Sequence, residues 1–78
     1  MFLYTVYDKV AQEHGPSFEA KNDEVAIRNV RDLIKNQRMD WRDYDLCCHA
    51  EIKRFDEELT VEPVSRLVNV PVEVPDGQ

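Results

Sequence analysis

The segment from Asn22 to Arg42, NDEVAIRNVRDLIKNQRMDWR, has the pattern of one amphipathic helix. Asn22 is a favoured N-cap residue, because its side-chain oxygen can accept a free backbone N–H of the first turn. Asp23 and Glu24 then place negative charge at the positive end of the helix dipole. The segment lacks a glycine stop, so we expect the helix to end between Asn36 and Arg42. The apolar residues recur at helical spacing and predict one buried stripe: Ala26, Ile27, Val30, Leu33 and Ile34.

The same segment carries a second stripe, made of cations at spacings of three and four residues. In a helix that continues to Arg42, these side chains lie within about 80° of arc. They could follow a phosphate backbone, and Trp41 and Tyr44 beside them could stack on unpaired bases. The alternative is a solvated helix face with ordinary pairs such as Arg28–Asp32, and with Trp41 covering the core. The candidate nucleic-acid-binding residues are Arg28, Arg31, Lys35, Arg38, Trp41 and Arg42.

Four other segments have strand patterns. Residues 2–7 are aromatic or β-branched with both faces largely apolar, which indicates a central strand. Residues 17–21 predict a short second strand after the Gly15-Pro16 breaker. Residues 44–53 alternate between apolar and polar side chains, and a turn then leads to a short return strand near residues 59–61. We therefore expect an α+β domain: a small, mostly antiparallel sheet in the order strand-strand-helix-strand-strand, with one helix packed across a face.

The chain changes character after Pro63. Val68, Val70, Val72 and Val74 alternate with residues that include two prolines. Because proline has no N–H to donate, this segment is expected to be an edge strand or an extended tail. We interpret residues 1–63 as the folded domain and residues 64–78 as its extended C-terminal segment. A valine ladder is a natural place to pair with a second copy, so these valines are candidate partner-binding residues and a homodimer is expected.

Length and charge exclude several classes of protein. A chain of 78 residues forms one domain with a modest core. The net charge of −6 argues against a nucleic-acid binder that uses its whole surface. The charge is uneven, because residues 1–42 carry seven basic and seven acidic side chains, whereas residues 43–78 carry three and nine. No apolar run approaches the ~20 residues that cross a bilayer, and the first residues lack a signal-peptide pattern, so we expect a cytoplasmic protein without membrane contact.

The Cys47-Cys48-His49 triplet suggests metal chemistry, but the spacing argues against it. Adjacent residues on a strand point to opposite faces, so Cys47 and His49 could share an ion and Cys48 could not. No second pair of ligands completes a tetrahedral set, and His14 is the only other histidine. We therefore expect Cys48 to pack in the core, both thiols to be free, and no metal site or cofactor. No third group orients Cys47, and no glycine loop could hold a phosphate, so an enzyme is not expected and no catalytic residue is assigned.

The order of several short motifs resembles one protein family. These motifs are Val6-Tyr7-Asp8-Lys9 with Ala11, Gly15-Pro16 with Phe18, Asn22-Asp23 with Ala26-Ile27-Arg28, and Asp43-Tyr44 with Leu46 and Glu51. Over residues 4–55 they resemble the small nonstructural protein of gokushovirus-type microviruses, which are single-stranded DNA bacteriophages, and similar proteins of some filamentous phages. The chain departs from that pattern in a shorter connection between helix and strand, in Ala50 where a glycine is common, and in Lys53 where an aspartate is. The resemblance implies a phage protein made in the cytoplasm of the infected bacterium, absent from the virion and linked to genome replication or packaging.

Two functional hypotheses of different classes follow. In the first, a non-enzymatic phage accessory protein contacts single-stranded DNA through the cationic helix face. In the second, a small dimeric interaction module binds a host or phage protein through its acidic C-terminal half and its valines. The first predicts that neutralising Arg31, Lys35 and Arg38 removes activity, and the second predicts that deleting residues 64–78 does so.

Overall fold

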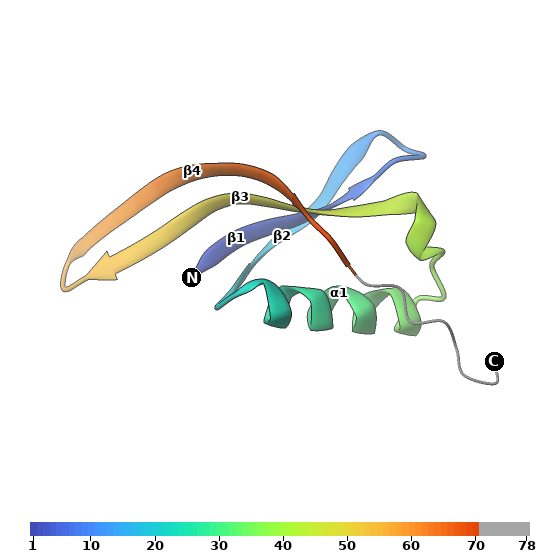
Figure 1. The fold of residues 1–78 in the computed structure, drawn as a ribbon, viewed down its shortest axis with the longest axis horizontal. Helices are drawn as coiled ribbons and strands as arrows, with labels where there is room; N and C mark the ends of the chain where they lie inside the picture. The colour runs from blue at the N-terminus through green and yellow to red at the C-terminus, as the bar shows by residue number, and fades with distance from the viewer. Residues whose placement is uncertain (71–78) are drawn as a thin grey trace.

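A computed structural model describes residues 1–70, which form one four-stranded sheet and one long helix (Figure 1). The elements in chain order are β1 (Phe2–Asp8), β2 (Glu13–Ala20), α1 (Asp23–Asn36), the 3-10 helix η1 (Trp41–Asp43), β3 (Tyr44–Phe55) and β4 (Glu58–Val68). All three strand pairings are antiparallel. The structure thus confirms a small α+β domain with one α-helix and an antiparallel sheet in these residues.

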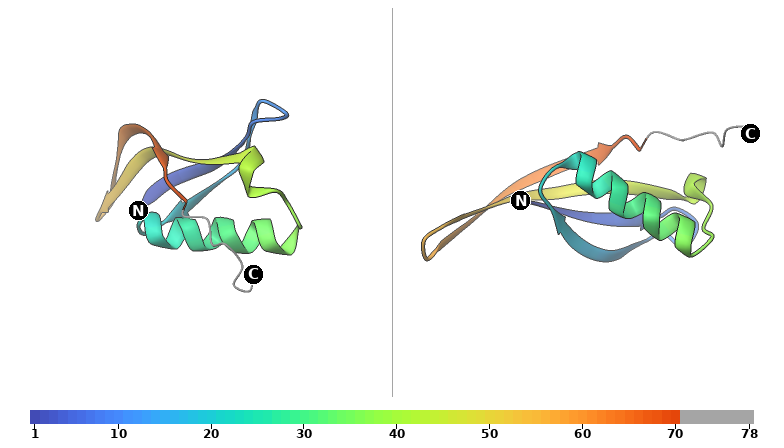
Figure 2. Two further views of the ribbon diagram at one scale, coloured as in Figure 1. Left: turned by 45° about the vertical axis from the view of Figure 1, so that its right-hand side comes forward. Right: turned by 90° about the horizontal axis from the view of Figure 1, so that it is seen from below.

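The strands lie in the order β2-β1-β3-β4, so β1 and β3 are central and β2 and β4 are edges. The apolar pattern of residues 2–7 predicted a central strand, and β1 is one. α1 runs across one face of the sheet, and within residues 1–70 no element covers the opposite face (Figure 1; Figure 2). One sheet face is therefore packed and the other is open to ligands.

α1 begins where the sequence predicts and ends at the early limit of the predicted range. The Asn22 side chain accepts a hydrogen bond from the backbone N–H of Val25 at 2.9 Å. At the other end, the N–H of Gln37 donates to the carbonyl of Leu33 at 3.0 Å, and Arg38 then takes a φ of 54°. This left-handed residue stops the helix in the way a glycine often does. α1 therefore ends within the predicted range and does not continue to Arg42.

The core lies between α1 and the sheet. Its buried side chains come from every long element: Tyr4, Val6, Ala20, Ala26, Val30, Leu46, Cys48 and Val68. Cys48 is 1% exposed, which confirms the prediction that its thiol packs in the core. A group of polar hydrogen bonds lies at the edge of this core. The Tyr4 hydroxyl donates to the Asp23 carboxylate at 2.6 Å, and the Arg66 guanidinium donates to the same carboxylate at 2.8 and 3.0 Å. The first turn of α1 is thereby tied to β1 and β4.

Two strands are longer than the sequence indicates, and both lie at an edge of the sheet. β2 begins at Glu13 and continues through Gly15 and Pro16, which were interpreted as a break. β4 continues through Pro63 to Val68, so residues 64–68 belong to the sheet and not to a separate tail. A proline is tolerated at an edge, because there its missing N–H interrupts no inner ladder.

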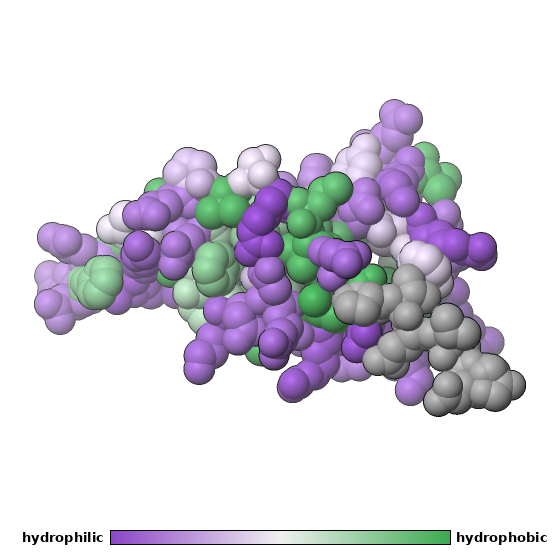
Figure 3. Space-filling view, viewed as in Figure 1, coloured by the Kyte–Doolittle hydropathy of each residue, from purple (hydrophilic) through white to green (hydrophobic). Residues whose placement is uncertain are grey.

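The β3–β4 hairpin extends well beyond the N-terminal start of α1 (Figure 1). Its turn is formed by Asp56 and Glu57, and three apolar residues near it are more than half exposed: Phe55 at 64%, Leu59 at 60% and Val61 at 55%. The face seen in Figure 3 is mostly hydrophilic, with apolar side chains gathered in the middle of the molecule. The hairpin therefore exposes apolar surface that the helix cannot cover.

Candidate functional site

Three of the predicted cationic residues lie on α1. Arg28 and Lys35 are exposed, and Arg31 is half-buried. Their spacing of three and four residues puts them within about 60° of arc on the helix surface. The structure thus keeps three of the five cations of the predicted stripe on one helix face.

The other predicted residues follow the helix on an irregular segment. Arg38 is exposed at the left-handed turn, and Trp41 is 47% exposed in η1. The Arg42 guanidinium donates to both oxygens of Asp40, at 3.1 and 3.0 Å. These hydrogen bonds lower the pKa of Asp40 and raise that of Arg42, so the charge of Arg42 is largely balanced in place. A stripe of five cations on one helix face required a helix that continues to Arg42, and α1 ends before Arg38 and Arg42.

Ion pairing separates the helix cations from the others. Lys9, Lys53, Arg54 and Arg66 each lie within 4.0 Å of a carboxylate, with Asp45, Glu62, Glu19 and Asp23 as their partners. Among residues 1–70, the cations without such a carboxylate are Lys21, Arg28, Lys35 and Arg38. All four belong to α1 or directly flank it. Sequence spacing alone does not reveal this difference, because the partner of each paired cation lies on another element of the fold.

The carboxylates of the same segment reduce its positive charge without cancelling it. Residues 21–38 contain five basic and three acidic side chains, which gives a net charge of +2 against −6 for the whole chain. Asp23 is engaged by Arg66, and this hydrogen bond together with that of Tyr4 holds the pKa of Asp23 below its usual range. The helix side of the molecule is therefore locally basic on an acidic protein.

The predicted partner-binding valines divide into three cases. Val68 is 7% exposed and belongs to the core, so its side chain is not available to a partner. Val70 is half-buried and packs against the same core. Val72 and Val74 lie outside the described residues. The interpretation of Val68 as a contact residue is therefore wrong, because its strand turns it toward α1.

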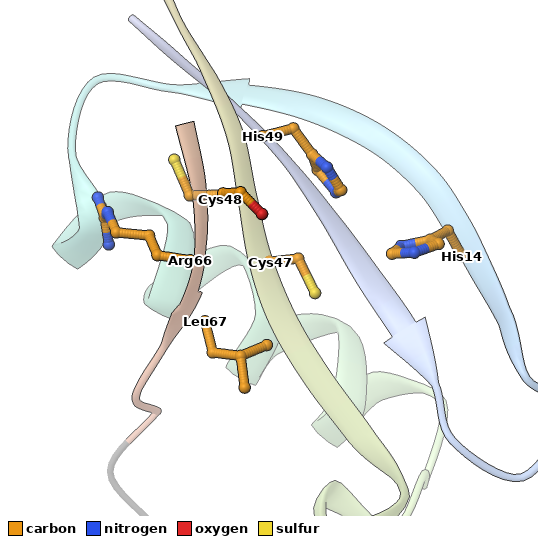
Figure 4. Close-up of a pocket in the computed structure, with 7 residues that line it drawn as sticks. His14, Cys47, Cys48, His49, Arg66 and Leu67 are labelled. Carbon is orange, nitrogen blue, oxygen red and sulfur yellow. The ribbon is translucent and has the colours of Figure 1, made fainter. Parts of the chain in front are cut away.

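A second group of functional side chains lies on the open face of the sheet (Figure 4). The ligand atoms of His14, Cys47 and His49 all lie within 4.8 Å of one another. The Thr5 hydroxyl is hydrogen-bonded to His14 Nδ1 at 2.8 Å and to His49 Nε2 at 2.6 Å. Burial, with a smaller effect from Asp45, raises the pKa of the Cys47 thiol. The sequence indicated that Cys47 and His49 share a face, but it gave no sign that His14 joins them, because that depends on the order of the strands.

Within residues 1–70, no helix is long and apolar enough to cross a membrane. No curated protein and no solved structure matches the chain. A family model described as Phage ORF5 protein matches residues 1–73, which is most of the chain. This match confirms the expectation of a bacteriophage protein, and the chain belongs to the Phage ORF5 protein family.

Proposed function

We propose that this phage protein is a non-enzymatic accessory factor that contacts single-stranded DNA through the helix side of its surface. It would act in the cytoplasm of the infected bacterium, during replication or packaging of the phage genome. The observation that supports DNA contact is the grouping of Lys21, Arg28, Lys35 and Arg38, the cations of residues 1–70 that no carboxylate pairs. A cation without an internal partner can bind a phosphate without first breaking an ion pair, and it releases a counterion when it does so.

The geometry suits a short segment of flexible strand. Arg28 and Lys35 are seven residues apart on α1, roughly 10 Å along the helix axis, and Arg38 extends the row beyond its end. Trp41, half exposed just past Arg38 in the chain, offers an aromatic face for an unpaired base. Stacking of this kind contributes about 1–3 kcal/mol per base and tolerates any sequence. We therefore expect weak binding to single-stranded DNA without base specificity. The affinity should fall steeply as the salt concentration rises.

The test is fluorescence anisotropy of a labelled single-stranded oligonucleotide, titrated with protein at several salt concentrations. Replacing Arg28, Lys35 and Arg38 by Gln removes three phosphate contacts, so the slope of log K against log salt should become shallower by roughly 2. The matched control replaces Lys9, Lys53 and Arg54 by Gln. Both triple variants lose three positive charges, but the control removes cations that are already ion-paired on the strands and their loops.

The expected result is weaker binding with a shallower salt dependence in the helix variant and near-normal binding in the control. Equal weakening in both variants would mean that only net charge matters, and no binding by the native chain at low salt would exclude the proposal. Circular dichroism of each variant checks that the fold is retained.

A second candidate function is that of a protein-interaction module that pairs with a second copy of itself. The observation that favours it is the exposed apolar strip on the β3–β4 hairpin, which includes Leu59 and Val61. In this proposal the strip is the contact surface, whereas Val68 is buried in the core. The association state in solution tests it.

A further inference from the structure

The group formed by His14, Cys47, His49 and Thr5 is assembled by three neighbouring strands. β1 lies between β2 and β3, and Thr5 of β1 is paired with Cys47 of β3. On the other side, His14 of β2 is paired with Tyr7, two residues further along β1. Because residues two apart on a strand share a face, His14 and Cys47 both lie on the face of Thr5, away from α1. The cluster is thus a consequence of the strand order.

A β-bulge brings His49 into the same group. In the pairing of β1 with β3, Tyr4 lies opposite Cys48 and Leu3 lies opposite Ala50, which leaves His49 as an extra residue. Such a bulge re-aims a side chain and is frequent beside functional sites. Here the His49 ring reaches the Thr5 hydroxyl and comes within 5.3 Å of the His14 ring, measured between centroids.

We propose that His14, Cys47 and His49 bind a single thiophilic divalent metal ion of the Zn²⁺ class. Two imidazoles and one thiolate suit such an ion, whereas Mg²⁺ and Ca²⁺ prefer oxygen ligands. In a tetrahedral site with Zn–N near 2.0–2.1 Å and Zn–S near 2.3 Å, the ligand atoms stand roughly 3.3–3.6 Å apart. The three ligand atoms already lie within 4.8 Å of one another. Side-chain rotations that move each atom by about an ångström bring them to the distances of a tetrahedral site.

The surroundings support the same site. Figure 4 shows the two imidazoles and the Cys47 thiol gathered on one side of the sheet, with the Cys48 thiol on the other side of β3. Metal-bound histidines commonly hydrogen-bond a second partner that fixes the ring, and the Thr5 hydroxyl can serve one of these rings in that way. His14 is exposed and Cys47 is half-buried, so an ion can enter from solvent. Three protein ligands leave a fourth position for water or for a ligand supplied from outside.

The experiment is a titration of the reduced full-length chain with Co²⁺, which reports thiolate ligation by a charge-transfer band, followed by competition with Zn²⁺. We expect one equivalent of Co²⁺ to bind, with the band present, and Zn²⁺ to displace it. Cys47→Ser should abolish the band. His14→Gln should weaken binding more than about tenfold, the least that loss of even an outer partner costs.

Cys48→Ala is the matched control, because it removes the adjacent thiol, which faces the core and contacts no ion in this proposal. It should keep both the band and the stoichiometry. Absence of saturable binding by the native chain would overturn the proposal, and so would unchanged binding in both Cys47→Ser and His14→Gln. Loss of the band in Cys48→Ala with retention in Cys47→Ser would also overturn it, since it would place the ion elsewhere.

Discussion

At the scale of single residues, Asp23 connects three elements. Its carboxylate, at the start of α1, accepts hydrogen bonds from Tyr4 on β1 and Arg66 on β4. Burial, followed by the hydrogen bond to Asp23, raises the pKa of Tyr4. The hydrogen bonds from Arg66 and then Tyr4 lower the pKa of Asp23. Both shifts mean that the folded protein prefers a neutral tyrosine beside an ionised aspartate, and that stability depends on pH at both ends of the scale.

The stability contributed by Asp23 is lost at low pH, whereas the stability contributed by Tyr4 is lost at high pH. Asp23 contributes stability that is present above its unfolded pKa of about 3.9 and is lost as pH falls through its lower folded pKa. Tyr4 contributes stability that is present below its unfolded pKa of about 10 and is lost as pH rises toward its higher folded pKa. Between these limits the contact should be insensitive to pH.

Tyr4→Phe tests this contact, because it removes one hydroxyl from a fully buried ring. We expect the free energy of unfolding near neutral pH to fall by about 1–2 kcal/mol, as for a hydrogen bond to a charged group that is partly exposed. Urea denaturation at several pH values measures it, and the difference from the native chain should shrink below pH ~4 and above pH ~10. Tyr7→Phe is the control, since the Tyr7 hydroxyl makes no hydrogen bond within residues 1–70. An equal loss in both variants would contradict the assignment.

At the scale of elements, α1 is held at its start more firmly than at its end. Asn22 caps the first turn, and the Asp23 contact lies one residue later. At the other end the helix is followed by the left-handed Arg38 and by η1. A disturbance at the start should therefore cost more than one farther along the helix.

Asn22→Ala should lower the free energy of unfolding by about 1 kcal/mol, because the N–H of Val25 loses its acceptor. The matched control is Asn29→Ala, the same substitution at an exposed position in the middle of α1. That change should be neutral or stabilise the protein by a few tenths of a kcal/mol, because alanine has the higher helix propensity. Thermal unfolding followed by circular dichroism compares the two. If both variants lose the same stability, the cap is not a determinant of the helix start.

The elements also show which features the sequence could reveal. The cap at Asn22 and the alternation of residues 44–53 are local signals, and both were interpreted correctly. The helix end could be predicted only as a range, because no residue type marks Arg38 as left-handed. The lengths of β2 and β4 were missed because Pro16 and Pro63 break an inner strand but not an edge strand, and edge position is a property of the whole sheet.

At the scale of the whole molecule, the two candidate functional surfaces lie on opposite sides of the sheet. The locally basic surface is on the helix side, and the His14, Cys47 and His49 cluster lies on the opposite face. Spacing correctly placed three of the five predicted cations on the helix. It could not predict the cluster, since His14 and His49 are 35 positions apart and meet only through the strand order. The separation means that DNA contact and metal binding can be tested independently on the same protein.

The hairpin adds a third surface, through which two copies of the chain are proposed to associate. This association should respond to salt in the opposite direction from DNA binding. Ile52 lies opposite Val61 and Arg54 lies opposite Leu59, so Ile52, Leu59 and Val61 share one face. Two copies that bury this strip bring together chains of charge −6, and the repulsion is screened by salt. Association should therefore strengthen as salt rises, whereas binding to DNA weakens.

Sedimentation equilibrium at low and high salt measures this association. Leu59→Thr with Val61→Thr should abolish it and change the free energy of unfolding by no more than about 0.5 kcal/mol per site, because both residues are exposed. Val10→Thr with Leu67→Thr makes the same two substitutions at exposed sites away from the strip, 75% and 67% exposed, and should leave association unchanged. A native chain that stays monomeric at high salt would exclude the hairpin as a self-contact. Equal loss in both double variants would show that total apolar exposure drives association and that the strip has no special part in it.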